Sequence, residues 1–251
     1  MMLDFFDCNC CIGRSAVTNP GSFYTTDELV SRMADYGIGR ALIYHTVARD
    51  HFPAEGNPLL SDITGRNPSL FPVWVVMPHH TGEFPSPCEL EKQMKRNKVK
   101  AVRIFPSAGR HNFSIKPYSA GPLLEMLAHN CIPLFVDIDE IGWDSADSLL
   151  ETYGDLPVVL CNTGYRSDRC IYPLMEAHGN VYLETSRYLS HLGIEALCSK
   201  EGSGRILFGS GMPVYTGAGA VFYISKLMLD DKDKQMIASG NLERLIGEIK
   251  L

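Results

Sequence analysis

The sequence predicts a single α/β domain folded as a closed (β/α)8 barrel, also called a TIM barrel. Eight short apolar runs recur along the chain with helical patterns between them, which is the order of elements in repeated βα units. The runs lack the polar–apolar alternation of half-exposed strands, so we expect strands buried on both faces of a parallel sheet. A chain of 251 residues has the usual length of such a barrel. An open doubly wound sheet is the alternative, but no glycine-rich phosphate loop follows the first run.

The first half of the chain contains four of the predicted strands. Thr25-x-x-Glu28 has the spacing of a capping box, which predicts the start of a helix. Asn57-Pro58 predicts the start of another, because asparagine caps helices and proline fits their first position. A charged helix is expected from Cys88 to about Asn97. The four strands are Leu3–Phe6, Ala41–Tyr44, Val73–Met77 and Ala101–Phe105.

The second half completes the set of eight. Ser145 is expected to cap a helix. Gly209, Ser210 and Gly211 end the last run, and such small residues predict a loop whose backbone closely approaches another group. Extra C-terminal helices are expected from about residue 219, with Asn241 as a cap, and we interpret residues 1–251 as one domain. The strands are Leu134–Val136, Val158–Leu160, Val181–Leu183 and Ile206–Phe208.

Composition narrows the class of partner. The net charge of −6 is spread without any block of like charge, so we expect neither nucleic acid nor a membrane as a partner. No apolar run approaches the roughly 20 residues of a membrane span. The segment Met1–Asp7 is acidic and unlike a signal peptide, and eight cysteines in such a chain are expected to be free thiols. These features favour a cytoplasmic protein.

Polar side chains follow almost every predicted strand. Because the carboxyl ends of the strands form the active-site face of a (β/α)8 barrel, this convergence predicts a small-molecule pocket there. There is no nucleophile elbow and no P-loop, so serine-hydrolase and phosphoryl-transfer chemistry have no support. The groups are Asp7, Asn9, Cys11, His45, His79, His80, Arg103, Asp137, Asp139, Asn162, Glu184, Ser186, Arg187, Ser210 and Gly211.

Four segments carry a resemblance to a known family. Phe6–Gly13 resembles the pattern D-x-H-x-H-x-G, Val159–Gly164 lies at the sixth strand, Arg205–Pro213 resembles R-[IV]-L-F-G-S-D-x-P, and Gly240–Leu245 is similar to G-N-A-x-R-L. The chain therefore resembles the amidohydrolase superfamily almost end to end, in the branch with metal-dependent hydrolases, decarboxylases and dicarboxylate lactonases. The resemblance implies the same barrel and a hydrolase or lyase that cleaves a C–O or C–N bond or removes CO2. It also implies a small, carboxylate-bearing substrate and a homodimer.

The resemblance does not extend to the metal ligands. Asn9 and Cys11 stand where the family has two histidines, Asp137 and Asn162 stand at two further histidine positions, and Gly211 replaces an aspartate. We therefore expect no tightly held metal, as in the lactonase branch. A thiolate and a carboxylate are suitable zinc ligands, so a divalent metal such as zinc on Cys11 and Asp137 is the alternative. Asparagine oxygens suit harder cations.

Arg103 and Asp137 are the main catalytic candidates. Arg103 lies within an apolar strand, where it either forms a salt bridge, to Asp137 or Glu184, or binds a substrate carboxylate. Asp137, His45 and His79 are candidates for proton transfer. Asp137 is a base if burial raises its pKa and a poor one if Arg103 lowers it. The predicted substrate-binding residues are Asn9, Cys11, Asn162, Glu184, Arg187 and Ser210.

The sequence leaves three functional hypotheses open. The first is a metal-independent enzyme of amidohydrolase type that acts on a small carboxylate-bearing substrate. The second is a small-molecule-binding barrel without catalysis. The third is a metalloenzyme with an altered ligand set. Whether the protein is an enzyme is not decided by the residues alone, because a fold does not determine a function.

Overall fold

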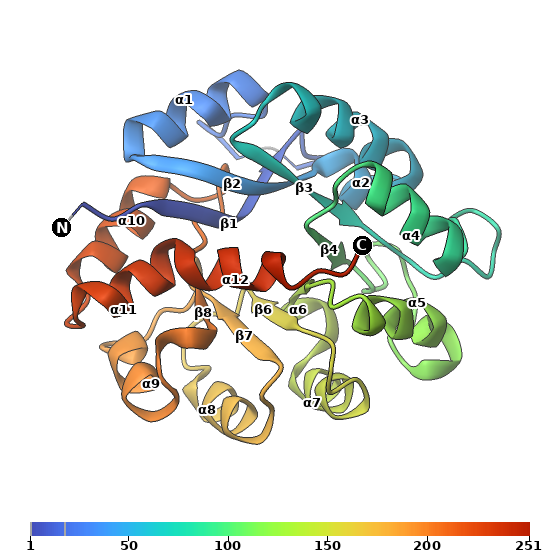
Figure 1. Ribbon diagram of the computed structural model, residues 1–251. Coiled ribbons are helices and arrows are strands. Elements are labelled where there is room, and N and C mark those ends of the chain that lie inside the picture. The colour runs from blue at the N-terminus through green and yellow to red at the C-terminus, as the bar shows by residue number, and fades with distance from the viewer. Residues whose placement is uncertain (1, 18) are drawn as a thin grey trace.

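Eight parallel strands, each hydrogen-bonded to the next in chain order, form the centre of this computed structural model (Figure 1). The structure describes residues 2–17 and 19–251. The predicted (β/α)8 barrel, a single domain, is therefore confirmed. The strands are β1 (Phe5–Ile12), β2 (Ile38–His45), β3 (Leu70–Val75), β4 (Ala101–Ile104), β5 (Leu134–Asp137), β6 (Val158–Cys161), β7 (Val181–Glu184) and β8 (Ile206–Leu207).

Backbone hydrogen bonds between β1 and the segment after β8 close the ring. The Cys8 amide donates to the Phe208 carbonyl at 2.9 Å, and the Gly211 amide donates to the Asn9 carbonyl at 2.9 Å. Because these bonds continue past the end of β8, the loop of small residues is held against β1. The candidate residues of β1 and of this loop are thereby neighbours.

Helices surround the strands (Figure 1). The predicted capping box is confirmed: Thr25 Oγ1 accepts from the Glu28 amide at 3.3 Å, and the Glu28 carboxylate accepts from the Thr25 amide at 3.1 Å. Short 3-10 and π segments are η1 (Ser203–Arg205) and η2 (Met236–Gly240). The α-helices are α1 (Thr26–Tyr36), α2 (Thr46–Asp50), α3 (Pro53–Arg66), α4 (Pro87–Arg96), α5 (Pro117–His129), α6 (Ile138–Ile141), α7 (Trp143–Thr152), α8 (Asp168–Ala177), α9 (Gly193–Glu201), α10 (Gly217–Lys226), α11 (Asp231–Gln235) and α12 (Asn241–Gly247). None of the helices within the described residues is both long and apolar enough to cross a bilayer.

Three predicted helix caps are wrong. Asn57 lies inside α3, where its amide group donates to the Val75 carbonyl at 2.8 Å and accepts from the Val75 amide at 3.0 Å. Asn241 is the first residue of α12, and its amide donates to the carbonyls of Ser203 (2.7 Å) and Ile206 (2.8 Å). Ser145 lies inside α7. The two buried asparagines pair with the backbone of distant elements, because buried peptide groups need partners.

Helix α12 crosses one end of the barrel, as Figure 1 shows. Its Leu242 and Leu245 belong to the same apolar cluster as Phe6, Phe135 and Leu207, whose side chains fill the barrel interior. A larger apolar cluster lies between the strands and the outer helices. The carboxyl ends of the strands, opposite α12, are left for the polar residues of the candidate site.

Replacing Leu245 by alanine tests the role of α12. Leu245 is fully buried in the interior cluster, so Leu245→Ala is expected to lower the free energy of unfolding by about 2–5 kcal/mol. Urea unfolding followed by circular dichroism measures this change. Met228→Ala is the control, because Met228 is exposed and its truncation should change stability by less than about 0.5 kcal/mol. Equal effects of the two substitutions would contradict the assigned role.

Candidate functional site

A cavity of about 160 Å3 lies at the carboxyl ends of the strands. It brings together six of the predicted catalytic and substrate-binding residues, which come from β1, β4, β5 and the loops after β6 and β7. Tyr44, Arg49 and Tyr215 also line it and were not expected. The six expected residues are Asn9, Cys11, Arg103, Asp137, Asn162 and Arg187.

The centre of this pocket is the guanidinium group of Arg103, which is 4% exposed. Its Nη1 donates to Asn9 Oδ1 at 2.7 Å, and its Nη2 donates to Asp137 Oδ1. The group also lies 4.9 Å from the centre of the Tyr44 ring, a cation–π contact. Burial opposes the charge, but Asp137 outweighs it and raises the pKa of Arg103. Of the two salt bridges expected for Arg103, the one to Asp137 is present, and Glu184 bonds to other groups.

Glu184 lies below the pocket and is fully buried. Its Oε2 accepts from Asn9 Nδ2 at 2.9 Å and from Ser186 Oγ at 2.8 Å. A β-carbon on Gly209 would lie 2.0 Å from Glu184 Oε1, so the loop backbone does closely approach another group, as the small residues predicted. Burial raises the pKa of Glu184 to about 7. Asn9 thus connects a cation, Arg103, with a carboxyl group that titrates near neutral pH.

Asp7 fixes the backbone around the site. Its Oδ1 accepts from the amides of Asn9 and Ser210, both at 3.0 Å. Ser210 is buried, and its Oγ accepts from the Met212 amide at 3.1 Å. Ser210 therefore stabilises the loop after β8. It does not line the pocket, although the sequence predicted it as a substrate-binding residue. Burial raises the pKa of Asp7, a second buried carboxyl group close to Glu184.

Arg187 and Asn162 lie on the loops after the neighbouring strands β7 and β6 and contribute to the rim. Arg187 Nη1 donates to the Tyr215 hydroxyl, and the guanidinium lies 5.3 Å from the centre of the Tyr215 ring. Among the described residues Arg187 has no carboxylate partner within ion-pair distance. Asn162 Nδ2 donates to Asp139 Oδ2. The positive charge of Arg187 is therefore available to an anionic ligand.

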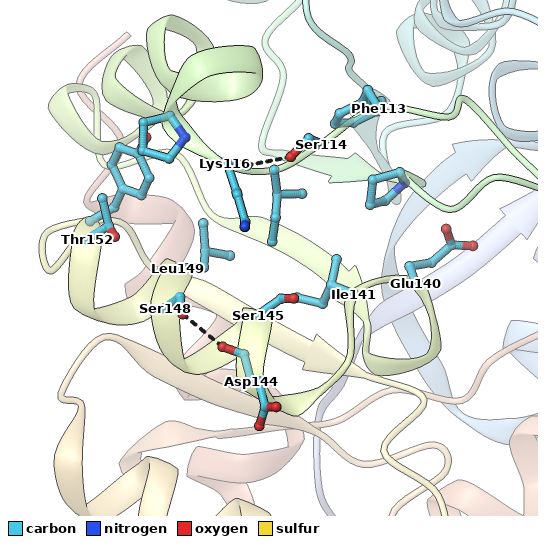
Figure 2. Close-up of a pocket in the computed structure, with 14 residues that line it drawn as sticks. Phe113, Ser114, Lys116, Glu140, Ile141, Asp144, Ser145, Ser148, Leu149 and Thr152 are labelled. Carbon is cyan, nitrogen blue, oxygen red and sulfur yellow. Dashed lines mark hydrogen bonds between the residues drawn. The ribbon is translucent and has the colours of Figure 1, made fainter.

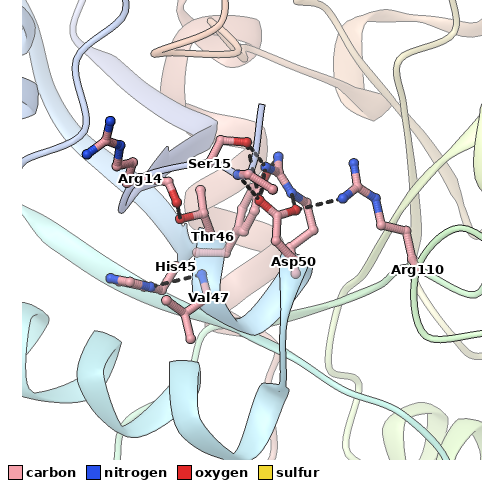
Figure 3. Close-up of polar contacts among 10 residues, drawn as sticks. Arg14, Ser15, His45, Thr46, Val47, Asp50 and Arg110 are labelled. Atoms are coloured by element: carbon pink, nitrogen blue, oxygen red, sulfur yellow. Dashed lines mark hydrogen bonds and ion pairs between the residues drawn. The ribbon is translucent and has the colours of Figure 1, made fainter. Parts of the chain in front are cut away.

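Neither candidate histidine lines the pocket. His45 Nδ1 accepts from the Val47 amide at 3.2 Å and caps α2, as Figure 3 shows, and burial lowers its pKa. His79 stacks against His80, with 4.5 Å between ring centres. His45 is the last residue of β2 and His79 follows β3, but both lie outside the set of side chains around Arg103. Of the three residues predicted for proton transfer, Asp137 is thus the one that lines the pocket.

A network around Asp50 supports the rim (Figure 3). The buried Asp50 carboxylate accepts from Arg49 at 2.6 and 2.9 Å, from Arg110 Nη1 at 2.7 Å and from Ser15 Oγ at 3.2 Å. Burial would raise the Asp50 pKa, but hydrogen bonds from Arg49 and Ala16 and the nearby arginine charges lower it to about 2. The network connects α2 with the loops after β1 and β4. In the sequence, this network could have been suspected from the adjacent charged residues Arg49 and Asp50, which follow closely after the second predicted strand.

A larger cavity of about 430 Å3 lies elsewhere, between residues 106–117 and helices α6 and α7. Figure 2 shows Lys116 beside Leu149, with Asp144 and Glu140 nearer the edge. None of the site residues expected from the sequence lines this cavity. The smaller pocket is the better candidate, because it alone contains the convergent polar groups at the strand ends.

The family model described as amidohydrolase matches residues 26–247. The chain belongs to the amidohydrolase family. A comparison with the curated proteins finds no match. Similar solved structures include an uncharacterised TIM-barrel protein from Bordetella bronchiseptica, at 16% identity and TM-score 0.76, over 98% of this chain and 99% of that chain. A putative 2-pyrone-4,6-dicarboxylic acid hydrolase from Pseudomonas putida has 17% identity and TM-score 0.72, over 99% of both chains.

A dihydroxybenzoic acid decarboxylase from Polaromonas sp. JS666 has 14% identity and TM-score 0.73, over 98% of this chain and 97% of that chain. That structure holds manganese and the inhibitor 2-nitroresorcinol. At these identities the solved structures show a shared fold. Whether a divalent metal fits this chain depends on its own side chains.

The side chains of this pocket do not fit a divalent cation. Asn9 Oδ1 and Asp137 Oδ1 already accept hydrogen bonds from Arg103, whose charge would repel a metal ion beside it. Burial raises the pKa of Cys11, which favours the neutral thiol over the thiolate that binds zinc. No group of three or more His, Cys, Asp or Glu suited to a metal occurs within residues 2–17 and 19–251. A β-carbon on Gly211 would lie 2.7 Å from the Tyr215 ring, so an aspartate there would displace Tyr215.

Glu184 is expected to make stability depend on pH. Its pKa rises from 4.5 to about 7 in the folded protein, so the folded state binds more protons between these values and stability falls as pH rises through them. The loss above pH 7 is up to about 3 kcal/mol. Glu184→Gln cannot titrate, so its unfolding free energy relative to wild type should improve by about that amount from pH 4.5 to 8.

Urea unfolding of both proteins across this pH range measures the difference. Asp7 titrates in both proteins, which largely removes its contribution from the comparison. Glu176→Gln, at an exposed position, should show no such change relative to wild type. A pH-independent difference between wild type and Glu184→Gln would show that folding does not raise the pKa of Glu184.

Proposed function

We propose that the protein is an amidohydrolase-type hydrolase or lyase that binds a small carboxylate-bearing substrate without a divalent metal. The observation that carries this proposal is the unbalanced charge of Arg187. Three arginines line the pocket, of which Arg103 pairs with Asp137 and Arg49 pairs with Asp50. Among the described residues, Arg187 donates to the Tyr215 hydroxyl and pairs with no carboxylate, and its fork of donors matches a carboxylate.

The likeness to solved structures is consistent with this substrate class. The proteins with the same fold include the dihydroxybenzoic acid decarboxylase and the putative 2-pyrone-4,6-dicarboxylic acid hydrolase, whose names describe carboxylated compounds. Because the chain belongs to the amidohydrolase family, we expect the reaction to be the cleavage of a bond in a substrate bound at the strand ends. Turnover assays with a panel of carboxylates identify the specific substrate.

In the proposed mechanism Asp137 transfers the proton. Arg103 holds Asp137 Oδ1, whereas Oδ2 accepts no hydrogen bond from the described residues. The salt bridge to Arg103 is the arrangement for which the sequence predicts a poor base, so the assignment rests on this free oxygen, which can still accept a proton from water or substrate. The Arg103 guanidinium, held by Asn9 and stacked on Tyr44, then stabilises negative charge that develops beside it. Arg187 keeps the substrate carboxylate at the rim, away from the reacting bond.

Two substitutions separate substrate binding from proton transfer. Arg187→Met should raise KM about 10- to 100-fold, the effect of losing a charged hydrogen bond. Asp137→Asn should lower kcat about 100- to 10,000-fold, because the amide cannot accept the proton. Both are measured against aromatic carboxylates, lactones and esters by mass spectrometry of products. Arg96→Met, at an exposed position of α4, is the control, and full activity in both test variants would refute the mechanism.

A non-catalytic binder is the second candidate, because neither His45 nor His79 lines the pocket. It predicts that carboxylates raise the unfolding temperature while no member of the panel is converted. The two candidates share the role of Arg187. They differ in whether Asp137→Asn changes a measured rate.

Chelation tests the metal-independent part of the proposal. Dialysis against EDTA, followed by addition of Mn2+ or Zn2+, should leave both the unfolding temperature and turnover unchanged. The reason is that Arg103 already supplies the positive charge at Asn9 and Asp137. Elemental analysis of protein purified without chelator or histidine tag should find far less than one metal per chain. One bound equivalent, with a fall in unfolding temperature on chelation, would contradict the proposal.

A further inference from the structure

The candidate pocket is small for a substrate. Its volume of about 160 Å3 is close to that of a cavity that binds one benzene ring, about 150 Å3. Pockets for small-molecule ligands usually have at least about 300 Å3. A carboxylate with one ring therefore fills this pocket, and any further part of the molecule has to leave it.

A second cavity, the side groove, adjoins the pocket. It has a volume of about 480 Å3 and lies between the loop after β7 and helix α10. Ser186, Arg187 and Tyr215 line both the pocket and the side groove. The far walls of the side groove include Leu189 on the loop and Ala220 on α10. The two cavities thus meet at the Arg187–Tyr215 pair.

The side groove suits an uncharged, apolar group. Among the described residues that line it, Arg187, at the junction, is the one with a charged side chain, and tyrosines, Leu189 and Ala220 supply apolar surface. Leu189 is 59% exposed, so an apolar ligand would remove this surface from water. The 430 Å3 cavity of Figure 2 is a poorer choice, because Lys116, Glu140 and Asp144 line it and it shares no lining residue with the pocket.

We propose that the side groove is a subsite for an apolar arm of the substrate, an alkyl or aryl group attached to a ring that carries the carboxylate. The inference rests on the proposed function, in which Arg187 binds that carboxylate. In this arrangement the Tyr215 ring packs against the arm, while the Tyr215 hydroxyl accepts a hydrogen bond from Arg187 and keeps it in place. The substrate class is accordingly a ring carboxylate with an apolar substituent, longer than the pocket alone accepts.

A series of ligands with increasing arms tests the subsite. Benzoate, 2-ethylbenzoate, 2-butylbenzoate and biphenyl-2-carboxylate, whose arms lie next to the carboxylate and so at the junction, are titrated by calorimetry into the protein. Affinity should rise with the arm, up to about fourfold for each methylene that is buried, and at least tenfold from benzoate to 2-butylbenzoate. Arg187→Met should weaken every member by a similar factor, because all share the carboxylate.

Two alanines of α10 offer a matched pair of variants. Ala220 lines the side groove, whereas Ala218 is exposed on the same helix and does not line it. Ala220→Phe should abolish the gain from the arm and leave benzoate affinity unchanged, and Ala218→Phe should retain the gain. Leu189→Asp, at an exposed position that tolerates charge, should also reduce the gain and serves if Ala220→Phe does not fold.

The outcomes separate the subsite from the proposed function. If benzoate binds through Arg187 but longer arms add no affinity, the subsite is wrong and the proposed function stands. The same holds if the gain survives in both Ala220→Phe and Leu189→Asp. If no member binds, or if Arg187→Met changes none of the affinities, the proposed function fails and the subsite fails with it.

Discussion

The buried guanidinium of Arg103 is the interaction on which the candidate site depends. A lone charge inside an apolar barrel would be strongly destabilising, so the neighbouring strands have to supply its partners. β1 supplies Asn9 and β5 supplies Asp137, while the Tyr44 ring of β2 lies beside it. Asn9 in turn directs its other amide atom to Glu184 of β7. One charge thereby sets the orientation of polar side chains from five strands, counting β4 itself.

The same charge explains how Asn9 and Asp137, which the sequence resemblance predicts at metal-ligand positions of the family, are held in one site. Asparagine and aspartate oxygens that would face a cation from solution face an internal cation on β4 instead. Tyr215 lies where a side chain on Gly211 would be, so the loop after β8 contributes an aromatic wall. The remaining unbalanced charge, on Arg187, is at the rim. In the proposed function, the anionic part of a ligand therefore binds at this rim and the reacting part lies beside Asp137.

Several positions show why the sequence predicted the fold better than it predicted the contacts of individual side chains. The capping box at Thr25 involves residues three apart, so its hydrogen bonds follow from local spacing. Asn57 and Asn241 have the residue type of a cap but bond to β3 and to the residues around β8. His45 was expected to face a ligand, yet its ring accepts from an amide two residues later. A short polar side chain such as asparagine or histidine can hydrogen-bond to many different groups, and the packing of the folded chain determines which of them lies within reach.

By itself the sequence determined the eight βα units, the family resemblance and the set of polar residues at the strand ends, because these depend on periodicity and on neighbouring residues. It also limited Arg103 to a salt bridge or a substrate clamp. The tertiary structure showed that the salt bridge forms, since Asp137 and Asn9 are distant in the chain and meet Arg103 only when the barrel closes. It likewise excluded His79 from the pocket and brought Arg187, Tyr215 and α10 together. Contacts between distant strands depend on the register and closure of the whole barrel, which no local pattern specifies.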